Sequence, residues 1–390
     1  MKKTIIFFST PAYGHILAEY PIIKRLVDMG YNVDWYSTEN FKSIVSESGA
    51  NFKVYKEDFD ELYDLANVTS DFYKLMQTLL ELNKKCFLDY INEIDKDEIY
   101  LILYDSMCSF AKNIAQVLNI NSVCLCSTLA YNFFTFTFSN MLLPSAKLTL
   151  THIPNLINMI KNENRFRKEN RIKKLNIIDL FVNSGDITIV LTLKELQPFV
   201  NTFPNTFKFV GTTIKDKICM KKQEYSNYDI YISAGSIWTE NENTENILNK
   251  ALGNEYFKDK KIILNVGNSN IKFNNNNIEC TRYTDQISLL KKCKLFVNHG
   301  GINSIYDSIS NKVPQICIPK QEEQRMNAII MKRNKIGYYI RNFNISQLQY
   351  YEGKIKKYNN NIEKYANLIN NTDGTTNAVN LIIEMIGNDE

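Results

Sequence analysis

The sequence predicts an α/β fold of two domains, each built on a parallel sheet, and three features support this. Short apolar runs alternate with helical patterns through the first third of the chain, which is typical of parallel strands joined by helices. A second series of the same kind begins after Gly211. The chain has 390 residues, and single cores stop growing at roughly 250–300 residues. We therefore expect two domains of similar size that face each other.

The first domain is expected to span residues 1–212. Short apolar runs predict its strands, and apolar residues three and four apart predict the helices between them. The predicted strands are Lys3–Ser9, Asn32–Tyr36, Phe52–Tyr55, Tyr100–Tyr104 and Ser122–Cys126. The predicted helices are Ile16–Met29, which Gly30 ends, and a long stretch near Phe72–Ile91.

The second domain is expected to span residues 228–375, after a linker at residues 213–227. The linker is a lysine-rich polar stretch with little periodicity. The predicted strands of this domain are Asp229–Ser233, Lys261–Val266, Leu295–Asn298 and Gln315–Ile318, and a helix is predicted at Glu245–Leu252. The same alternation of strands and helices predicts a second parallel sheet.

Composition excludes several classes of protein. The apolar share of 44% and the charged share of 23% are ordinary for a folded domain, and a net charge of +4 provides no electrostatic basis for binding nucleic acid or a membrane surface. The apolar run Thr4–Phe8 is too short for a signal peptide, because Ser9, Thr10 and Pro11 end it. No stretch approaches the roughly 20 apolar residues that span a bilayer. We therefore expect a cytoplasmic protein without stable membrane insertion.

The eight cysteines are scattered along the chain and are expected to be reduced. Cys124 and Cys126 lie in an apolar run, where alternation places both side chains on one face of a strand. A zinc site would also need histidines, and none of the three stands beside a cysteine cluster; they are His15, His152 and His299.

Two segments leave alternatives open. The aromatic stretch Tyr131–Phe138 is either a buried strand or core helix, or the wall of an apolar acceptor pocket, since such pockets are lined by aromatic residues. The basic stretch Asn162–Lys174 is interpreted as a solvated helix face, with contact to an anionic surface as the alternative.

Two polar residues are expected at one edge of the first sheet. His15 follows the first strand, in what we interpret as a loop, and Asp105 ends the fourth strand. Ligands of open parallel sheets bind at the carboxyl ends of the strands, so both residues fall on the same rim. A carboxylate bonded to one imidazole nitrogen fixes the tautomer and raises the basicity of the other nitrogen. The pair is therefore a candidate base that could deprotonate a hydroxyl.

The second domain contains a candidate site for a diphosphate. An apolar strand runs into Gly300 and Gly301, and a helix is expected to begin near Asn303 and Ser304. Glycines let the backbone approach a ligand, and a helix N-terminus attracts anions without a metal ion. His299 adds a further donor. A similar turn after the strand in Asp229–Ser236 could contribute Gly235 and Ser236.

At these residues the chain resembles the family-1 nucleotide-sugar glycosyltransferases. The resemblance runs from the first strand to about Gly337, and its most specific part is the donor signature His299–Ser304 followed by Pro319–Ala328. It implies the GT-B fold, in which two Rossmann-like domains face each other across a cleft that holds the active site. It also implies that the last helix, within residues 376–390, crosses back to the first domain.

The resemblance implies roles for individual residues. His15 would be the base and Asp105 its orienting partner. The diphosphate would contact the residues of the glycine turn, namely His299, Gly300, Gly301, Asn303 and Ser304. Asp307 stands where the family has a glutamate that binds the ribose, and Asp285 replaces a family proline. The remaining donor contacts implied are Ser236, Tyr283 stacked on the uracil, Gln286 beside the nucleoside, and Glu323 and Gln324 on the sugar hydroxyls.

The expected function is that of an inverting glycosyltransferase without cofactor or metal ion. It would move a sugar, with UDP-glucose as the family's commonest donor, to a hydroxyl of a small apolar or aromatic acceptor, as a monomer or homodimer. The Asp-x-Asp matches Asp58–Asp60 and Asp95–Asp97 lie in charged loops and are interpreted as solvated acids. The alternatives are a nucleotide-sugar epimerase, a lipid-linked cell-wall transferase, or a non-catalytic homologue that acts as partner of another enzyme.

Overall fold

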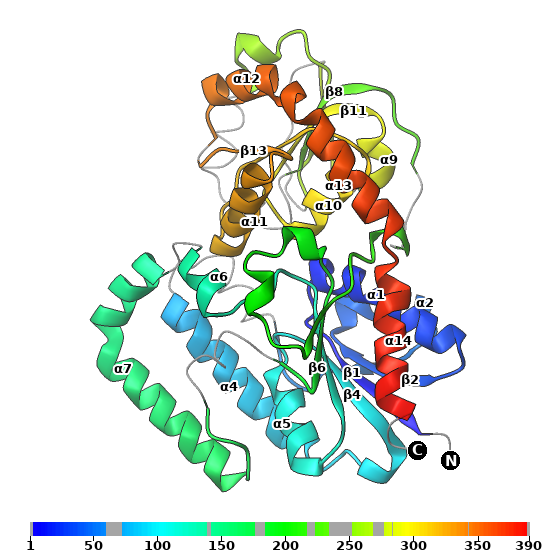
Figure 1. Ribbon diagram of the computed structural model, residues 1–390, viewed down its shortest axis with the longest axis vertical. Coiled ribbons are helices and arrows are strands. Elements are labelled where there is room, and N and C mark those ends of the chain that lie inside the picture. Colours follow the sequence, from blue (N-terminus) through cyan, green and yellow to red (C-terminus); the bar gives the residue numbers. More distant parts are fainter. Residues whose placement is uncertain are drawn as a thin grey trace. The chain divides into compact units, whose positions relative to one another are not determined.

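The computed structural model of the chain shows two α/β units (Figure 1). It describes residues 3–59, 72–138, 142–175, 184–216, 223–233, 252–267, 277–282, 284–341 and 343–387. Unit 1 comprises Met1–Lys217 and Asp373–Glu390, and unit 2 comprises Ile218–Thr372. Each unit is built on a parallel sheet, so the predicted fold class is confirmed.

The described strands of unit 1 form a seven-stranded parallel sheet in the order β3-β2-β1-β4-β5-β6-β7. These strands are β1 (Thr4–Phe8), β2 (Asn32–Ser37), β3 (Asn51–Val54), β4 (Ile99–Asp105), β5 (Ser122–Cys126), β6 (Ile187–Val190) and β7 (Phe207–Phe209). The chain order reverses between β1 and β4, which lie side by side with Phe8 opposite Tyr104. Ligands bind at such reversal points, so this edge positions the site.

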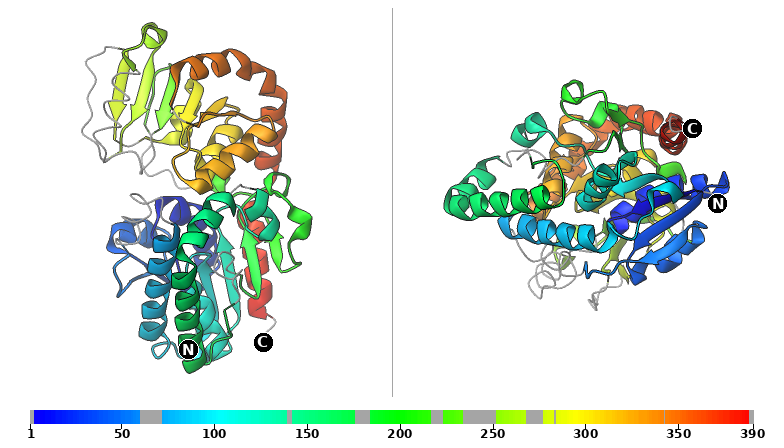
Figure 2. Two further views of the ribbon diagram at one scale, coloured as in Figure 1. Left: turned by 90° about the vertical axis from the view of Figure 1, so that its left-hand side faces the viewer. Right: turned by 90° about the horizontal axis from the view of Figure 1, so that it is seen from below.

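Helices cover both faces of this sheet. The described helices of unit 1 are α1 (Tyr13–Asp28), α2 (Lys42–Glu47), α4 (Phe72–Tyr90), α5 (Ser109–Leu118), α6 (Phe133–Phe138), α7 (Leu142–Glu169) and α14 (Gly374–Gly387). Helices α4, α5 and α7 lie along one face, and α1 and α14 lie along the other (Figure 1). A view turned by 90° shows α4 and α7 running side by side (Figure 2).

The core of unit 1 explains why its strands read as apolar runs. Alternate residues of β1 and β4, such as Phe8 and Tyr104, pack against α4 and α5 in one cluster with Phe87 and Phe110. The residues between them face the other side and are also buried, as Phe7 is. Strands buried on both faces carry few polar positions, which is the pattern of a doubly covered parallel sheet.

The described strands of unit 2 form a parallel sheet in the order β10-β9-β8-β11-β12-β13. These strands are β8 (Tyr228–Ser233), β9 (Ile262–Asn265), β10 (Ile278–Thr281), β11 (Cys293–Asn298), β12 (Gln315–Cys317) and β13 (Tyr338–Tyr339). The described helices are α9 (Gln286–Leu290), α10 (Ile302–Ser310), α11 (Glu322–Arg333), α12 (Ile345–Lys354) and α13 (Asn359–Asn371). Here the order reverses between β8 and β11, so the ends of these two strands form the corresponding edge.

The structure corrects the predicted start of the first helix. Helix α1 begins at Tyr13 and not at Ile16, so His15 lies in its first turn and not in a loop. Ala12 precedes the helix and makes no side-chain capping bond, so the sequence lacks the usual signal for a helix start. Four short strands were not predicted, namely β6, β7, β10 and β13. Of the helix predicted at Glu245–Leu252, all but Leu252 lies outside the described residues.

The basic stretch Asn162–Lys174 is only partly a solvated face. Arg167 is buried, and its Nε donates a hydrogen bond of 2.8 Å to Glu163 Oε1, a carboxylate that also pairs with Lys84 on α4. A buried carboxylate needs such partners, because leaving it unpaired would be costly. The interpretation as a solvated face is therefore wrong for Arg167. None of the helices that the structure describes is long and apolar enough to cross a membrane.

Helix α14 packs against α1 in unit 1. Its start is capped by Asp373, which accepts hydrogen bonds from the Thr376 N–H at 2.9 Å and from the Thr376 hydroxyl at 2.8 Å. Gly374 follows directly and is buried against the backbone at Thr212, three residues after β7. A β-carbon at Gly374 would lie 2.5 Å from the Thr212 carbonyl oxygen, which is backbone and cannot rotate away.

We predict that Gly374→Ala destabilises unit 1 by about 1–3 kcal/mol, because the added methyl group forces the helix and the backbone at Thr212 apart. The sign is opposite to the usual gain for glycine to alanine in a helix. Gly387→Ala, at the other end of α14, meets nothing within 4 Å and serves as the control. Urea unfolding midpoints measure both; equal midpoints for the two variants would contradict this packing.

Candidate active site

The edge where β1 and β4 end holds a buried imidazole–carboxylate pair. His15 lies in the first turn of α1, and Asp105 is the last residue of β4. The His15 Nδ1 atom is 2.7 Å from Asp105 Oδ2. Asp105 is fully buried, whereas the His15 side chain is 15% exposed. The imidazole therefore connects a carboxylate inside the protein to the solvent side of this edge.

Asp105 is held ionised by its neighbours. Its Oδ1 atom accepts a hydrogen bond of 2.6 Å from the Thr10 hydroxyl and one of 2.9 Å from the Met107 N–H. Burial opposes ionisation, but the charge and hydrogen bond of His15, the neighbouring Glu19 carboxyl group and the hydrogen bond of Thr10 lower the pKa of Asp105 to about 2. An ionised carboxylate can only accept hydrogen bonds, so the proton between Asp105 and His15 belongs to His15 Nδ1. The lone pair of the neutral ring is therefore on Nε2.

Ser127 and Thr10 complete this arrangement, and sequence reasoning did not identify either. The Ser127 Oγ atom is 2.8 Å from His15 Nδ1, and Thr10 binds the partner carboxylate. Ser127 directly follows β5, the strand beside β4, and Thr10 lies two residues after β1. Both residues follow neighbouring parallel strands, and such residues share one edge of the sheet. These positions were the sequence signal that could have identified them as site residues.

A third titratable side chain, Glu19, lies in the same cluster. One ligand-capable atom from each of His15, Glu19 and Asp105 lies within 4.8 Å of the others, and within the described part of the chain this is the group that could hold a metal ion. Glu19 is fully buried. Burial raises the pKa of its carboxyl group well above the ordinary value, and the charge of Asp105 adds to the effect. Glu19 was not among the residues predicted for the site.

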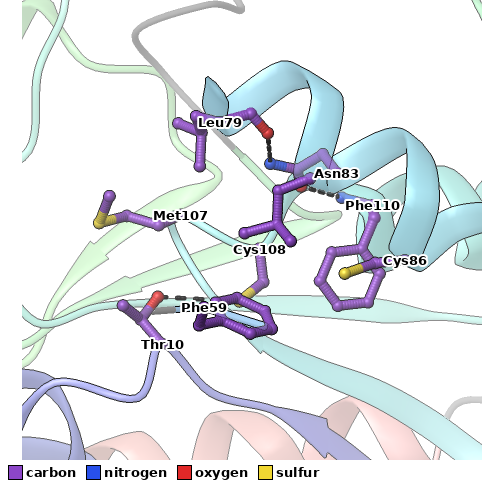
Figure 3. Close-up of a pocket in the computed structure, with 9 residues that line it drawn as sticks. Thr10, Phe59, Leu79, Asn83, Cys86, Met107, Cys108 and Phe110 are labelled. Atoms are coloured by element: carbon purple, nitrogen blue, oxygen red, sulfur yellow. Dashed lines mark hydrogen bonds between the residues drawn. The ribbon is translucent and has the colours of Figure 1, made fainter. Parts of the chain in front are cut away.

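A narrow, mostly apolar cavity with room for about one water molecule lies next to Thr10, which binds Asp105 (Figure 3). It is lined from α4, from the connection that follows β4, and from the residue that binds Asp105; the lining residues are Thr10, Phe59, Leu79, Leu82, Asn83, Cys86, Met107, Cys108 and Phe110. Asn83 is held in place, since its Oδ1 accepts from the Phe110 N–H at 2.8 Å.

The aromatic stretch Tyr131–Phe138 does not form core at its start. Phe133 and Phe134 lie at the beginning of α6 and are 61% and 49% exposed, so the prediction of a buried strand or core helix is wrong for them. Phe134 lies beside Phe199, with ring centroids 6.1 Å apart. Neither Phe133 nor Phe134 lines the cavity next to the imidazole–carboxylate pair.

The polar turn predicted in the second domain lies between β11 and α10. Gly300 adopts a φ of +85°, which favours glycine, and a β-carbon there would lie 2.8 Å from the Gln324 carbonyl oxygen. Asn298 accepts a hydrogen bond of 2.8 Å from the Gly300 N–H, and Asn327 of α11 donates one of 3.1 Å to the Gly300 carbonyl. These two asparagines, which were not predicted as site residues, fix the shape of the turn.

This turn leads into a helix end suited to an anion. Gly301 precedes α10, no side chain caps the helix there, and no acidic residue lies in its first turn, which holds Asn303 and Ser304. A helix N-terminus carries a partial positive charge and N–H donors. His299 stands just before the turn, where burial lowers its pKa to about 4, so its ring is neutral. Its buried Nδ1 has no hydrogen-bond partner among the described residues.

Two residues predicted beside the nucleoside bind each other. Gln286 Nε2 donates a hydrogen bond of 2.5 Å to Asp307 Oδ2 and lies 3.5 Å from Ser304 Oγ. Asp307 is fully buried, so its carboxylate relies on such donors. Asp285, which replaces the family proline, precedes α9 and accepts from the Ser288 N–H at 3.2 Å. The aspartate therefore starts this helix by capping it.

The remaining predicted donor residues differ in their surroundings. Gln324 is buried near the start of α11, and its Oε1 accepts hydrogen bonds from the Lys320 N–H at 3.0 Å and the Gln321 N–H at 3.3 Å. This amide therefore holds the start of the helix. Glu323 beside it is half-buried. Ser236 and Tyr283 lie outside the described residues.

The chain is similar to known glycosyltransferases in sequence. A family model described as UDP-glucoronosyl and UDP-glucosyl transferase matches residues 229–352. The NDP-glycosyltransferase YjiC of Bacillus licheniformis is 28% identical over 363 residues, covering 87% of this chain and 85% of the relative. YojK of Bacillus subtilis, named an uncharacterized UDP-glucosyltransferase, is 25% identical over 357 residues, covering 88% of this chain and 86% of the relative.

Solved structures show the same fold. The glycotransferase of kitacinnamycin superposes with a TM-score of 0.82 at 17% identity and covers 98% of both chains. The calicheamicin glycosyltransferase CalG4 superposes with a TM-score of 0.79 at 17% identity and covers 99% of both chains. The chain therefore has the GT-B fold, and its second unit matches the model of the UDP-sugar-dependent glycosyltransferases.

Proposed function

We propose that this enzyme transfers a sugar, with UDP-glucose as the expected donor, to a hydroxyl of a small apolar acceptor, inverts the anomeric configuration, and uses no metal ion. The observation that carries the proposal is the contact of 2.7 Å between His15 Nδ1 and the buried Asp105 carboxylate. The relative YojK is named a UDP-glucosyltransferase, which supports the choice of donor.

In the proposed reaction His15 is the general base. The acceptor hydroxyl gives its proton to His15 Nε2 while its oxygen attacks the anomeric carbon, and the bond from that carbon to the diphosphate breaks. Asp105 keeps the Nδ1 proton in place and stabilises the imidazolium that forms. A base of this kind contributes about 10²–10⁴ to the rate. A single displacement by the acceptor oxygen inverts the anomeric carbon, giving a β-glycoside from an α-linked donor.

The glycine turn of unit 2 is proposed to hold the diphosphate as it leaves. Backbone N–H groups at the start of α10 are aimed by a turn that Asn298 and Asn327 hold rigid. Fixed dipoles stabilise developing negative charge without reorganising during the reaction. The neutral His299 ring can donate one further hydrogen bond. These groups offset the charge of the leaving diphosphate, which is the task that a metal ion performs in metal-dependent transferases.

The apolar residues around the narrow cavity beside Thr10 are proposed to form part of the acceptor site. Its lining is apolar apart from Thr10 and Asn83, and Thr10 also bonds to Asp105. The exposed rings Phe133 and Phe134 offer a second apolar surface for a larger acceptor.

We predict that His15→Ala lowers kcat for glucosyl transfer by about 10²–10⁴, because the acceptor loses its base. Affinity for UDP should stay within about twofold, since the diphosphate turn lies in unit 2. Lys24→Ala, an exposed residue on the same helix, serves as the control and should leave both quantities unchanged. Turnover is measured with UDP-glucose and a panel of phenols, and UDP affinity by isothermal titration calorimetry. Near-wild-type turnover in His15→Ala would remove the base role from this residue.

We predict that Gly300→Ala weakens UDP binding at least about tenfold, because the methyl group collides with the Gln324 carbonyl and displaces the turn. Gly353→Ala, in α12 of the same unit, meets nothing within 4 Å and should bind UDP as the wild type does. Calorimetric titration of both variants checks this, with circular dichroism to confirm folding. A folded Gly300→Ala variant that binds UDP normally would separate this turn from the diphosphate site.

A further inference from the structure

Glu19 is a buried carboxyl group that the proposed mechanism does not use. It lies four residues after His15 on α1, so both side chains are on the same side of the helix. Glu19 is 0% exposed, and neither of its carboxyl oxygens makes a hydrogen bond of ordinary geometry with a described residue. Its carboxyl nevertheless lies within 4.8 Å of the paired atoms of His15 and Asp105. A charged group in this position would be very costly.

We propose that Glu19 is a positioning residue of the imidazole–carboxylate pair: it stays a carboxylic acid, and its O–H donates a hydrogen bond to the Asp105 carboxylate that orients His15. The proposal rests on the proposed role of His15 as base. A rotation of the Glu19 side chain would make this contact, since the atoms concerned lie within 4.8 Å of one another.

Two adjacent buried carboxyl groups cannot both be ionised, and the surroundings decide which one keeps the proton. Asp105 receives hydrogen bonds from Thr10, from the Met107 N–H and from His15. Glu19 receives none from the described residues. The negative charge therefore resides on Asp105, and the proton on Glu19. Burial and then the charge of Asp105 raise the pKa of Glu19 well above its usual value, in agreement with this assignment.

The other titratable groups around Glu19 do not compete for this role. The thiols of Cys108, Cys124 and Cys126 are buried, and burial raises the pKa of each, for Cys126 to about 11, so all three are neutral near pH 7. Helix α14, which packs on α1, contributes Glu384, which is exposed. Strand β2 contributes Asp34, which pairs with Lys53.

A protonated Glu19 has a consequence for stability that can be measured. In the unfolded chain Glu19 ionises near its ordinary pKa of 4.5, whereas in the folded protein it keeps its proton. A group with a raised pKa stabilises the fold below its unfolded pKa, and this contribution is lost as the pH rises toward the folded value. Glutamine has nearly the same shape, can donate the same hydrogen bond and takes up no proton. Glu19→Gln should therefore avoid this loss.

The first experiment compares urea unfolding of the wild type and Glu19→Gln from pH 4 to pH 8. The two unfolding constants should agree near pH 4. Above pH 4.5 the wild type should become less stable than Glu19→Gln. The ratio of the two unfolding constants should change by about tenfold per pH unit. Parallel curves, or a variant that is less stable at pH 8, would overturn the proposal. This readout does not depend on catalysis, so it remains informative even if His15 is not the base.

The second experiment tests the effect on the pair. Glu19→Gln should keep kcat/KM within about twofold of the wild type. The acid limb of the pH profile of kcat/KM should stay at the same pH. Glu19→Leu, which fills the space without a donor, leaves more charge on Asp105 and strengthens the hold on the His15 proton, so the acid limb should move to higher pH. A purely structural role predicts lower stability for Glu19→Leu with no shift of this limb. An acid limb that moves equally in Gln and Leu variants would also contradict the proposal.

Discussion

The hydrogen bond between His15 and the buried Asp105 is the interaction on which the proposed chemistry depends. A free histidine exists as two tautomers, with the proton on either ring nitrogen. Only the tautomer with the proton on Nδ1 leaves the lone pair of Nε2 available to take a proton from the acceptor hydroxyl. Asp105 selects that tautomer because it is ionised, fully buried and held by Thr10 and the Met107 N–H. The base is thus prepared before any substrate binds, so orienting it costs nothing during the reaction.

The parallel topology explains why His15 and Asp105 meet in unit 1 and why a second site stands at the matching edge of unit 2. In each unit the strand order reverses beside the first strand, at β1 and β4 in unit 1 and at β8 and β11 in unit 2. The imidazole–carboxylate pair stands at the first of these edges, and the glycine turn follows β11 at the second. Unit 1 thereby supplies the proposed base, and unit 2 supplies the proposed donors for an anion. The same architectural rule produces two different sites from unrelated residues.

The fold and the centre of the site could be predicted from the sequence, because their signals are local. Buried strands such as β5 read as continuous apolar runs, and the glycine turn combines a strand end with polar residues. The start of α1 could not be predicted, since Ala12 offers no capping side chain. Glu19 also left no signal, because a charged residue in an amphipathic helix normally faces solvent. Gln324 also has a structural role that the resemblance did not imply, since its amide oxygen caps α11.

Nitrogen NMR of the histidine rings tests the central claim most directly. The chain has three histidines, so the His15 signals can be assigned by their loss in His15→Ala. Near pH 7 the proton should reside on Nδ1, with a shift typical of a strong hydrogen bond to a carboxylate, and Nε2 should be unprotonated. That pattern should be lost in Asp105→Asn. An Nε2–H tautomer in the wild type, or a pattern unchanged in Asp105→Asn, would contradict the claim that Asp105 prepares His15 as the base.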